Sequence, residues 1–180
     1  MEGGATPSPL FPPRCRNSHI YEGTNGIQGN DLVFRKLARD SGAAFNELVT
    51  EIGSFLNEFP KDASGDFKTM HSFLTNALTS LKESAAWILD NIKTNPALAA
   101  ASASPFLRLC GNVLGGYYLI RSATLAQQDL AQKKGDANFM TSKIMTARFY
   151  AAHVLPQCAA LAITVCEGGL PTLEGLESLS

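Results

Sequence analysis

The sequence predicts an all-α protein, built as an antiparallel bundle of about five helices. Apolar residues recur every three or four positions between Ile27 and Val165, which is the period of helices that bury one face. Proline, glycine and polar clusters interrupt this pattern and mark short turns. No stretch alternates apolar and polar residues as a half-buried strand does. Because short turns join neighbouring helices in opposite directions, we expect antiparallel packing.

Composition narrows the class of protein. The 180 residues suit one domain with a buried core, and a formal net charge of -1 gives no field that would draw nucleic acid or anionic lipid. The four cysteines lack C-x-x-C spacing and no signal peptide precedes them, so we expect reduced thiols in a cytoplasmic protein, or in the mitochondrial matrix of a eukaryote. The most apolar stretch, residues 105–120, is shorter than the roughly 20 residues that a bilayer requires and is interrupted by Arg108 and Asn112. Membrane insertion is not expected.

The chain divides into three parts by composition. Residues 1–19 contain four prolines among glycines and serines and have no periodic apolar face, so we expect a disordered or irregular arm. Residues 20–169 carry the helical pattern and form the domain. Residues 170–180 follow Gly168-Gly169, a pair that ends helices, and are predicted to be a loose tail.

Local signals predict where the first helices begin and end. Asn25 and Gln28 have the spacing of a capping box, in which the two side chains pair with backbone amides of the first turn. This helix should end at Asp40-Ser41-Gly42. The inner face of this first helix should comprise Ile27, Phe34, Leu37 and Ala38. The second helix should end before Pro60, with an inner face of Phe45, Leu48, Val49, Ile52, Phe55, Leu56 and Phe59. The third should follow Asp66, with an inner face of Phe67, Met70, Leu74, Ala77, Leu78, Leu81, Ala85, Ile88 and Ile92.

Prolines predict the breaks in the second half of the chain. Pro96 suits the first position of a helix, where its missing amide costs nothing. Pro105 either kinks this helical region or restarts it after Ser104. The last helix follows a turn at Lys133-Lys134-Gly135-Asp136, and Pro156 inside that helix should bend it.

Three glycines lie in the helix that follows Pro105. Gly111, Gly115 and Gly116 each cost roughly 1 kcal/mol of helix stability against alanine. We expect the close approach of a neighbouring helix to offset that cost.

Glu22 is the first candidate for chemistry. It lies in a turn before a helix, where Gly23 lets a backbone approach a ligand closely and Thr24 offers a hydroxyl. The free amides of a helix start favour an anion. A carboxylate in this setting, once desolvated by a bound thioester chain, could act as a general base. A lone glutamate in a turn is more often solvated and inert.

The residues around Glu22 resemble a known motif. Tyr21-Glu22-Gly23-Thr24, followed by Asn25-Gly26-Ile27-Gln28, is similar to the segment that carries the catalytic glutamate of the flavin-dependent acyl-CoA dehydrogenases. Segments at 95–99, 105–109 and 147–151 resemble the branch with an additional C-terminal helical extension, which includes enzymes of the 3-methylmercaptopropionyl-CoA dehydrogenase type. The likeness covers most of residues 20–169.

The resemblance implies roles for six residues. Glu22 would be the catalytic base that removes the α-proton of an acyl-CoA, while a hydride leaves the β-carbon for the flavin of FAD. Tyr21 and Gly23 would bind substrate. The residues that would contact FAD are Thr24, Asn25 and Gln28.

The resemblance also implies parts that these 180 residues do not show, namely an N-terminal helical domain and a middle β-domain. We therefore expect the C-terminal portion of an acyl-CoA dehydrogenase, incomplete as an enzyme by itself because the cofactor carries the redox chemistry. Its partners would be further copies of the chain or the missing dehydrogenase domains. The alternative is a non-catalytic helical module for oligomerisation or interaction, which keeps the motif by descent.

Other polar and aromatic residues favour structural interpretations. The three histidines are far apart in sequence and have no acid or cysteine at ligand spacing, so no metal site is expected. His71 should lie at the boundary of the third helix's apolar face. Four basic residues are predicted to lie on solvated helix faces rather than against CoA phosphates or a partner subunit: Arg108, Arg121, Lys143 and Arg148. Core or interface positions are predicted for Trp87, Tyr117 and Tyr118.

Overall fold

A computed structural model describes residues 25–59 and 65–178 of the chain. Every regular element in these ranges is helical, which confirms the all-α prediction. The elements are α2 (Asn25–Asn30), η1 (Asp31–Leu37), α3 (Ala43–Asn57), α4 (Gly65–Thr94), α5 (Pro96–Ala101), α6 (Ala103–Ala131), α7 (Ala137–His153), α8 (Gln157–Glu167) and α9 (Gly169–Glu177).

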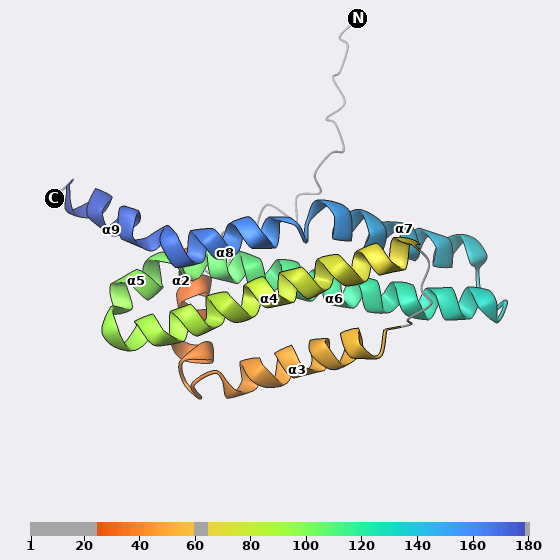
Figure 1. The fold of residues 1–180 in the computed structure, drawn as a ribbon, viewed down its shortest axis with the longest axis horizontal. Helices are drawn as coiled ribbons and strands as arrows, with labels where there is room; N and C mark the ends of the chain where they lie inside the picture. The colour runs from red at the N-terminus through yellow and green to blue at the C-terminus, as the bar shows by residue number, and fades with distance from the viewer. Residues whose placement is uncertain (1–24, 60–64, 179–180) are drawn as a thin grey trace, which may run out of the picture.

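The long helices form an antiparallel bundle (Figure 1). α4 and α6 lie at the centre and run in opposite directions. α3 packs on one side of them, and the consecutive helices α7 and α8 pack on the other. The short helices α2, α5 and α9 gather at one end. This arrangement confirms the predicted architecture.

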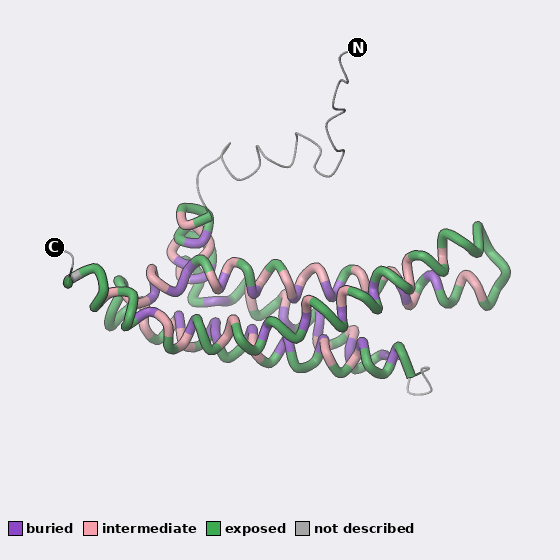
Figure 2. Tube along the Cα trace, turned by 90° about the horizontal axis from the view of Figure 1, so that it is seen from above, coloured by how far each residue is buried: buried purple, intermediate pink, exposed green. Residues whose placement is uncertain are grey.

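The core lies between the central helices and the two outer layers. α4 and α6 turn their apolar stripes toward one another, and the outward faces are exposed (Figure 2). Each large apolar side chain in the core contributes roughly 1.5–3 kcal/mol relative to an exposed position. Fully buried members are Val33, Ile52, Leu74, Ile88, Phe106, Leu109, Val113 and Ile120.

The first helix changes its hydrogen-bond pattern, which the sequence did not predict. α2 is α-helical, but η1 is a π-helix, with hydrogen bonds between residues five apart instead of four. The wider turn brings residues spaced by four more nearly into line, so Gly29, Val33 and Leu37 share the buried face. Ile27 was predicted on that face and is 59% exposed, because it lies on the other side of α2 from Gly29. The capping interaction predicted for Asn25 stays a prediction.

A carboxylate holds the turn before α3. Asp40 accepts hydrogen bonds from the backbone amides of Gly42, Ala43 and Ala44 at 3.0, 3.1 and 3.0 Å. The bond from Ala44 is the largest of the effects that hold the pKa of Asp40 below its ordinary value. Gly42 has φ +85°, a left-handed conformation that glycine adopts without strain. The predicted end of the first helix is therefore confirmed.

The prolines act as predicted. Pro96 is the first residue of α5, and the Asn95 side chain accepts a hydrogen bond from the Leu98 amide at 3.2 Å. The chain restarts as α6 at Ala103, shortly before Pro105. Of the two alternatives for Pro105, a restart rather than a kink is therefore observed.

The last predicted helix consists of two. α7 and α8 meet at an angle of 41°, and Pro156 directly precedes α8, which confirms the predicted bend. By length and hydropathy, no single helix within 25–59 and 65–178 could cross a membrane, although α7 and α8 pass that test when they are taken together as a bent pair.

The C-terminal segment corrects a prediction. A loose tail was expected from Leu170, but α9 is a helix up to Glu177. Gly169 is buried against α5: a Cβ atom added to it would lie 2.7 Å from Leu98 Cδ1 and 3.2 Å from Ser102 Oγ. Packing on α5 therefore outweighs the poor helix propensity of the glycine pair.

The glycines of α6 allow close packing at two positions of three. A Cβ at Gly115 would lie 2.5 Å from the Tyr150 hydroxyl, and a Cβ at Gly116 would lie 2.6 Å from Leu155 Cδ2. Nothing lies within 4 Å at Gly111. The predicted close approach is confirmed for the first two glycines and is wrong for Gly111.

Candidate functional site

The motif that suggested catalysis lies at the edge of the described residues. Tyr21, Glu22, Gly23 and Thr24 fall outside them, so their predicted roles stay predictions. Asn25 and Gln28 lie in α2, and both are exposed. The structure thus gives the position of the helix that follows the motif.

α2 is anchored by a close backbone contact. A Cβ at Gly29 would lie 2.8 Å from the Ala103 carbonyl carbon and 3.0 Å from the Ser104 nitrogen, both at the start of α6. Backbone atoms cannot swing aside, so only glycine fits there without a shift of the helix. The Asp31 carboxylate and the Arg35 guanidinium form an ion pair at 2.9 Å on the exposed side of η1. Val33 is fully buried and fixes the other side. Gly29 and Val33 thereby hold α2 and η1 against the bundle.

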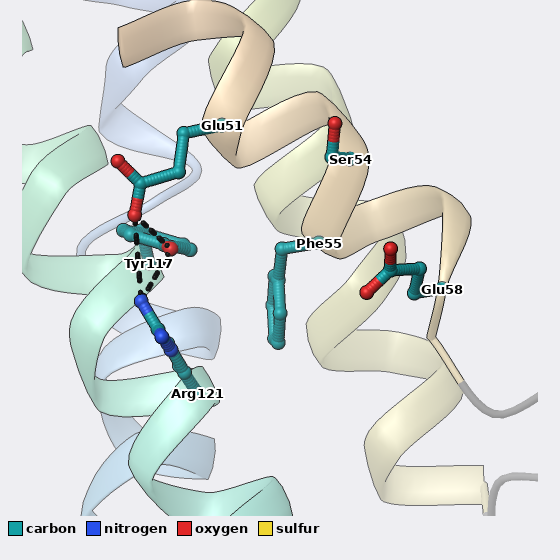
Figure 3. A pocket seen from close by; sticks show the side chains of 6 residues that line it. All are labelled: Glu51, Ser54, Phe55, Glu58, Tyr117 and Arg121. Atoms are coloured by element: carbon teal, nitrogen blue, oxygen red, sulfur yellow. Dashed lines mark hydrogen bonds and ion pairs between the residues drawn. The ribbon is translucent and has the colours of Figure 1, made fainter.

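A hydrogen-bonded polar cluster joins α3 to α6 (Figure 3). The Tyr117 hydroxyl donates to Glu51 Oε1 at 2.8 Å, and Arg121 donates to the Tyr117 oxygen at 2.8 Å. Arg121 also lies 3.4 Å from Glu51 Oε1. Phe55 packs edge-on against the Tyr117 ring, with centroids 5.4 Å apart. Together with Ser54 and Glu58, these side chains line an open cleft of about 390 Å³.

Electrostatics give this cluster a structural role. Burial raises the pKa of Tyr117, and the hydrogen bond to the Glu51 carboxylate adds to the shift, since both favour the neutral hydroxyl. The phenol therefore stays protonated and donates, while the positive charge of Arg121 balances Glu51. The arrangement pins α3 to α6 and does not generate a nucleophile.

Sequence reasoning missed this cluster. Tyr117 and Arg121 are four apart on one helix face, which is a detectable signal. Their partner Glu51 lies 66 residues from Tyr117, and no local pattern identifies it. The predicted core position of Tyr117 is confirmed, whereas Tyr118 is 56% exposed. Trp87 packs at the edge of the core.

A second, smaller cleft of about 270 Å³ lies between α6 and α7. The Lys143 ammonium lies 4.9 Å from the centroid of the Phe139 ring, which is a cation–π distance. The surface that lines the cleft is mainly apolar, and Lys143 adds a cation to it. Its remaining lining residues are Leu119, Ser122, Ser142 and Thr146.

The other basic residues and His71 take the predicted structural positions. Arg148 pairs with Asp66 at 3.1 Å, and Arg108 lies 3.5 Å from the Gln157 side-chain oxygen, both at exposed sites. His71 Nε2 lies 3.1 Å from the Leu56 carbonyl oxygen, at the boundary of the core. Within the described ranges no group of three histidine, cysteine or acidic residues could hold a metal ion.

With this geometry in place, comparison with known proteins settles the ancestry. The family model described as acetyl-CoA dehydrogenase C-terminal like matches residues 48–174. The chain is a C-terminal region of the acyl-CoA dehydrogenase family. A 3-methylmercaptopropionyl-CoA dehydrogenase of Ruegeria pomeroyi is 36% identical to this acyl-CoA dehydrogenase region over 141 residues, which cover 78% of the chain and 24% of the relative.

Two further relatives of the acyl-CoA dehydrogenase region align over a similar share of the chain and of their own length. A butyryl-CoA dehydrogenase of Syntrophomonas wolfei is 28% identical over 79% of the chain and 23% of the relative. A broad-specificity linear acyl-CoA dehydrogenase of Mycobacterium tuberculosis is 31% identical over 76% of the chain and 23% of the relative. The chain thus spans about a quarter of the length of the curated relatives that it matches.

Proposed function

We propose that the chain is the C-terminal portion of a FAD-dependent acyl-CoA dehydrogenase and contributes Glu22 as the catalytic base. One observation carries the proposal: the motif Tyr21-Glu22-Gly23-Thr24 directly precedes a helix that docks on a bundle of the family's C-terminal type. The substrate is an acyl-CoA thioester, and the reaction introduces an α,β double bond.

The chemistry assigned to the chain is proton transfer and charge stabilisation. The Glu22 carboxylate accepts the α-proton, and the electrons of that C–H bond form the double bond as a hydride leaves the β-carbon. FAD, when bound, supplies the hydride acceptor. The backbone amide of Glu22 donates to the thioester carbonyl and stabilises the negative charge that develops on its oxygen. Desolvation by the acyl chain makes the carboxylate a stronger base.

The neighbouring residues hold substrate and cofactor in this proposal. Tyr21 and Gly23 line the substrate, and Thr24 contacts FAD. Asn25 and Gln28 fit a cofactor contact because their amide side chains are exposed and can both donate and accept hydrogen bonds. In this proposal most of the flavin site belongs to dehydrogenase domains beyond these 180 residues, and turnover requires those domains.

A chimaera tests the proposal. The aligned region of the Ruegeria pomeroyi relative is replaced by this chain, and the purified chimaera is titrated anaerobically with 3-methylmercaptopropionyl-CoA. We expect bound flavin whose visible absorbance bleaches on addition of the thioester. A helical chimaera that retains flavin and is not reduced would contradict the proposal.

A second candidate is a non-catalytic interaction module. It is favoured by the position of the family match, which begins at residue 48 and so lies downstream of the motif. Buried residues of α3 to α8 belong to one core cluster. Under this candidate the chimaera is helical and colourless. The partner is then the dehydrogenase domains or another copy, and the compartment is cytoplasmic or the mitochondrial matrix under either candidate.

A further inference from the structure

The contact between α2 and α6 is made by backbone atoms. Gly29 is buried, and a Cβ added to it would lie 2.8 Å from the Ala103 carbonyl carbon, 2.9 Å from the Ala103 carbonyl oxygen and 3.0 Å from the Ser104 nitrogen. An ordinary Cβ contact is 3.4 Å or longer, so a methyl group at position 29 requires the two backbones to separate by about 0.6 Å, the difference between 2.8 and 3.4 Å. We call this contact of Gly29 with Ala103 and Ser104 the α2 seat.

The C-terminal helices brace the α2 seat. Ser102 lies between α5 and α6 and is 1% exposed, and its hydroxyl donates to the Val165 carbonyl oxygen of α8 at 2.7 Å. Gly169, the first residue of α9, also packs there, since a Cβ added to it would lie 3.2 Å from Ser102 Oγ. Because α8 and α9 hold this junction, bulk added at position 29 displaces α2 rather than the junction.

η1 fixes the other end of α2. Val33 is 0% exposed and Leu37 is 3% exposed, so this segment is anchored in the core. The Ala38 amide donates to the Val33 carbonyl oxygen at 3.0 Å, a bond between residues five apart. Such π-type turns inside helices are rare and occur frequently at functional sites. With η1 anchored, a displacement at Gly29 passes toward the N-terminal end of α2.

That end of α2 carries the residues assigned to chemistry under the proposed function. Asn25 and Gln28 belong to α2 itself. Glu22 precedes Asn25 by three residues, so the covalent chain keeps the two Cα atoms within roughly 11 Å of each other. Reaction rates depend steeply on such positions, because a misplacement of about 1 Å caused far from the reacting atoms can cost about 100-fold.

We propose that Gly29 is a positioning residue: the α2 seat sets the distance between the bundle and the base, Glu22. Gly29 touches neither substrate nor cofactor and acts through α2. The inference rests on the proposed function and deepens it, because it assigns a role to a residue upstream of the family match at 48–174.

Stopped-flow reduction of the chimaera by 3-methylmercaptopropionyl-CoA, without oxygen, tests this role. Gly29→Ala should lower the limiting rate constant of flavin reduction about tenfold, as a shift of about 0.6 Å implies. The thioester concentration that gives half of that rate should not change, because the base moves and the thioester does not. Gly111→Ala is the matched control, since a Cβ there meets nothing within 4 Å. Partial unfolding would lower the amplitude of reduction and leave the rate constant of the folded fraction unchanged.

Two buried serines give a second test that adds no bulk. Ser102→Ala removes the brace, so the rate constant should fall, although by less than in Gly29→Ala. Ser84→Ala is its matched control: Ser84 is 0% exposed, and its hydroxyl has no hydrogen-bond partner among the residues that the structure describes. This control should react at the unmodified rate. The serine pair decides the question if Gly29→Ala does not fold.

Amide hydrogen exchange of the 180-residue chain tests the α2 seat without catalysis. Gly29→Ala should speed the exchange of residues 33–37, because a displaced α2 opens the adjoining turns, whereas Gly111→Ala should not. Unchanged exchange in Gly29→Ala would overturn the α2 seat. If the unmodified chimaera and Gly29→Ala were reduced with equal rate constants, the positioning role would be overturned while the proposed function stood. An unmodified chimaera that retains flavin and is not reduced would overturn the proposed function, and the positioning role with it.

Discussion

The glycines of α6 allow one substitution to be made in two matched settings. Gly116→Ala and Gly111→Ala both lie inside α6 and gain the same helix propensity, about 1 kcal/mol. Their surroundings differ: a Cβ at position 116 would lie 2.6 Å from Leu155 Cδ2 and 3.1 Å from both Cγ and Cδ1, whereas a Cβ at 111 meets nothing within 4 Å. The difference between the two variants therefore isolates the packing cost.

The packing cost at position 116 follows from Leu155. That side chain is 2% exposed and three of its atoms crowd the new methyl group, so it cannot rotate into solvent. Overpacking of this kind costs about 1–3 kcal/mol. We expect Gly111→Ala to stabilise the protein by about 1 kcal/mol, and Gly116→Ala to be less stable than it by about 1–3 kcal/mol. Gly115→Ala should fall between them, because the half-buried Tyr150 can tilt its hydroxyl away.

Urea unfolding monitored by far-UV circular dichroism measures these differences. The midpoint should shift while the slope of the unfolding free energy with urea stays constant, because the exposed surface hardly changes. If Gly116→Ala proved as stable as Gly111→Ala, the close packing of Leu155, in the turn between α7 and α8, on α6 would be refuted.

Three further predictions concern the core and its polar contacts. Leu78→Ala should destabilise the protein by about 2–5 kcal/mol in urea unfolding, because Leu78 is 7% exposed in the core. Tyr117→Phe should cost about 0.5–1.5 kcal/mol by loss of its hydrogen bonds. Tyr118→Phe at the exposed neighbouring position is the control and should cost nothing measurable. Burial raises the pKa of Cys110 to about 12 and that of Cys158 to about 11, from 9.0. Both thiols should therefore resist alkylation at pH 8 until the protein unfolds. Because the folded state holds these protons more tightly, the unfolding free energy should fall as pH rises above 9.

Features with local causes could be predicted from the sequence. Pro96 starts α5 and Pro156 bends the last helix because a missing amide acts on its own backbone, whatever the rest of the fold. The periodic spacing of apolar residues predicted the buried faces of α3, α4 and α6, because that spacing depends only on the local helix. These signals lie within a few residues of their effects.

Features that depend on contacts between residues far apart in the sequence could not be predicted from it. Gly29 packs on Ala103, far along the chain, so Ile27 on the other side of α2 faces outward. α9 is helical through its packing on α5, although the pair Gly168-Gly169 predicted a loose tail. Of the candidate site, the motif around Glu22 was found by resemblance to a family.

The most direct test of the central claim is anaerobic flavin reduction in the chimaera, compared between Glu22 and Glu22→Gln. We predict that both proteins retain FAD and the same helical content, that the first is reduced by the acyl-CoA, and that Glu22→Gln is not. Equal rates of reduction in the two proteins would contradict the assignment of Glu22 as the base.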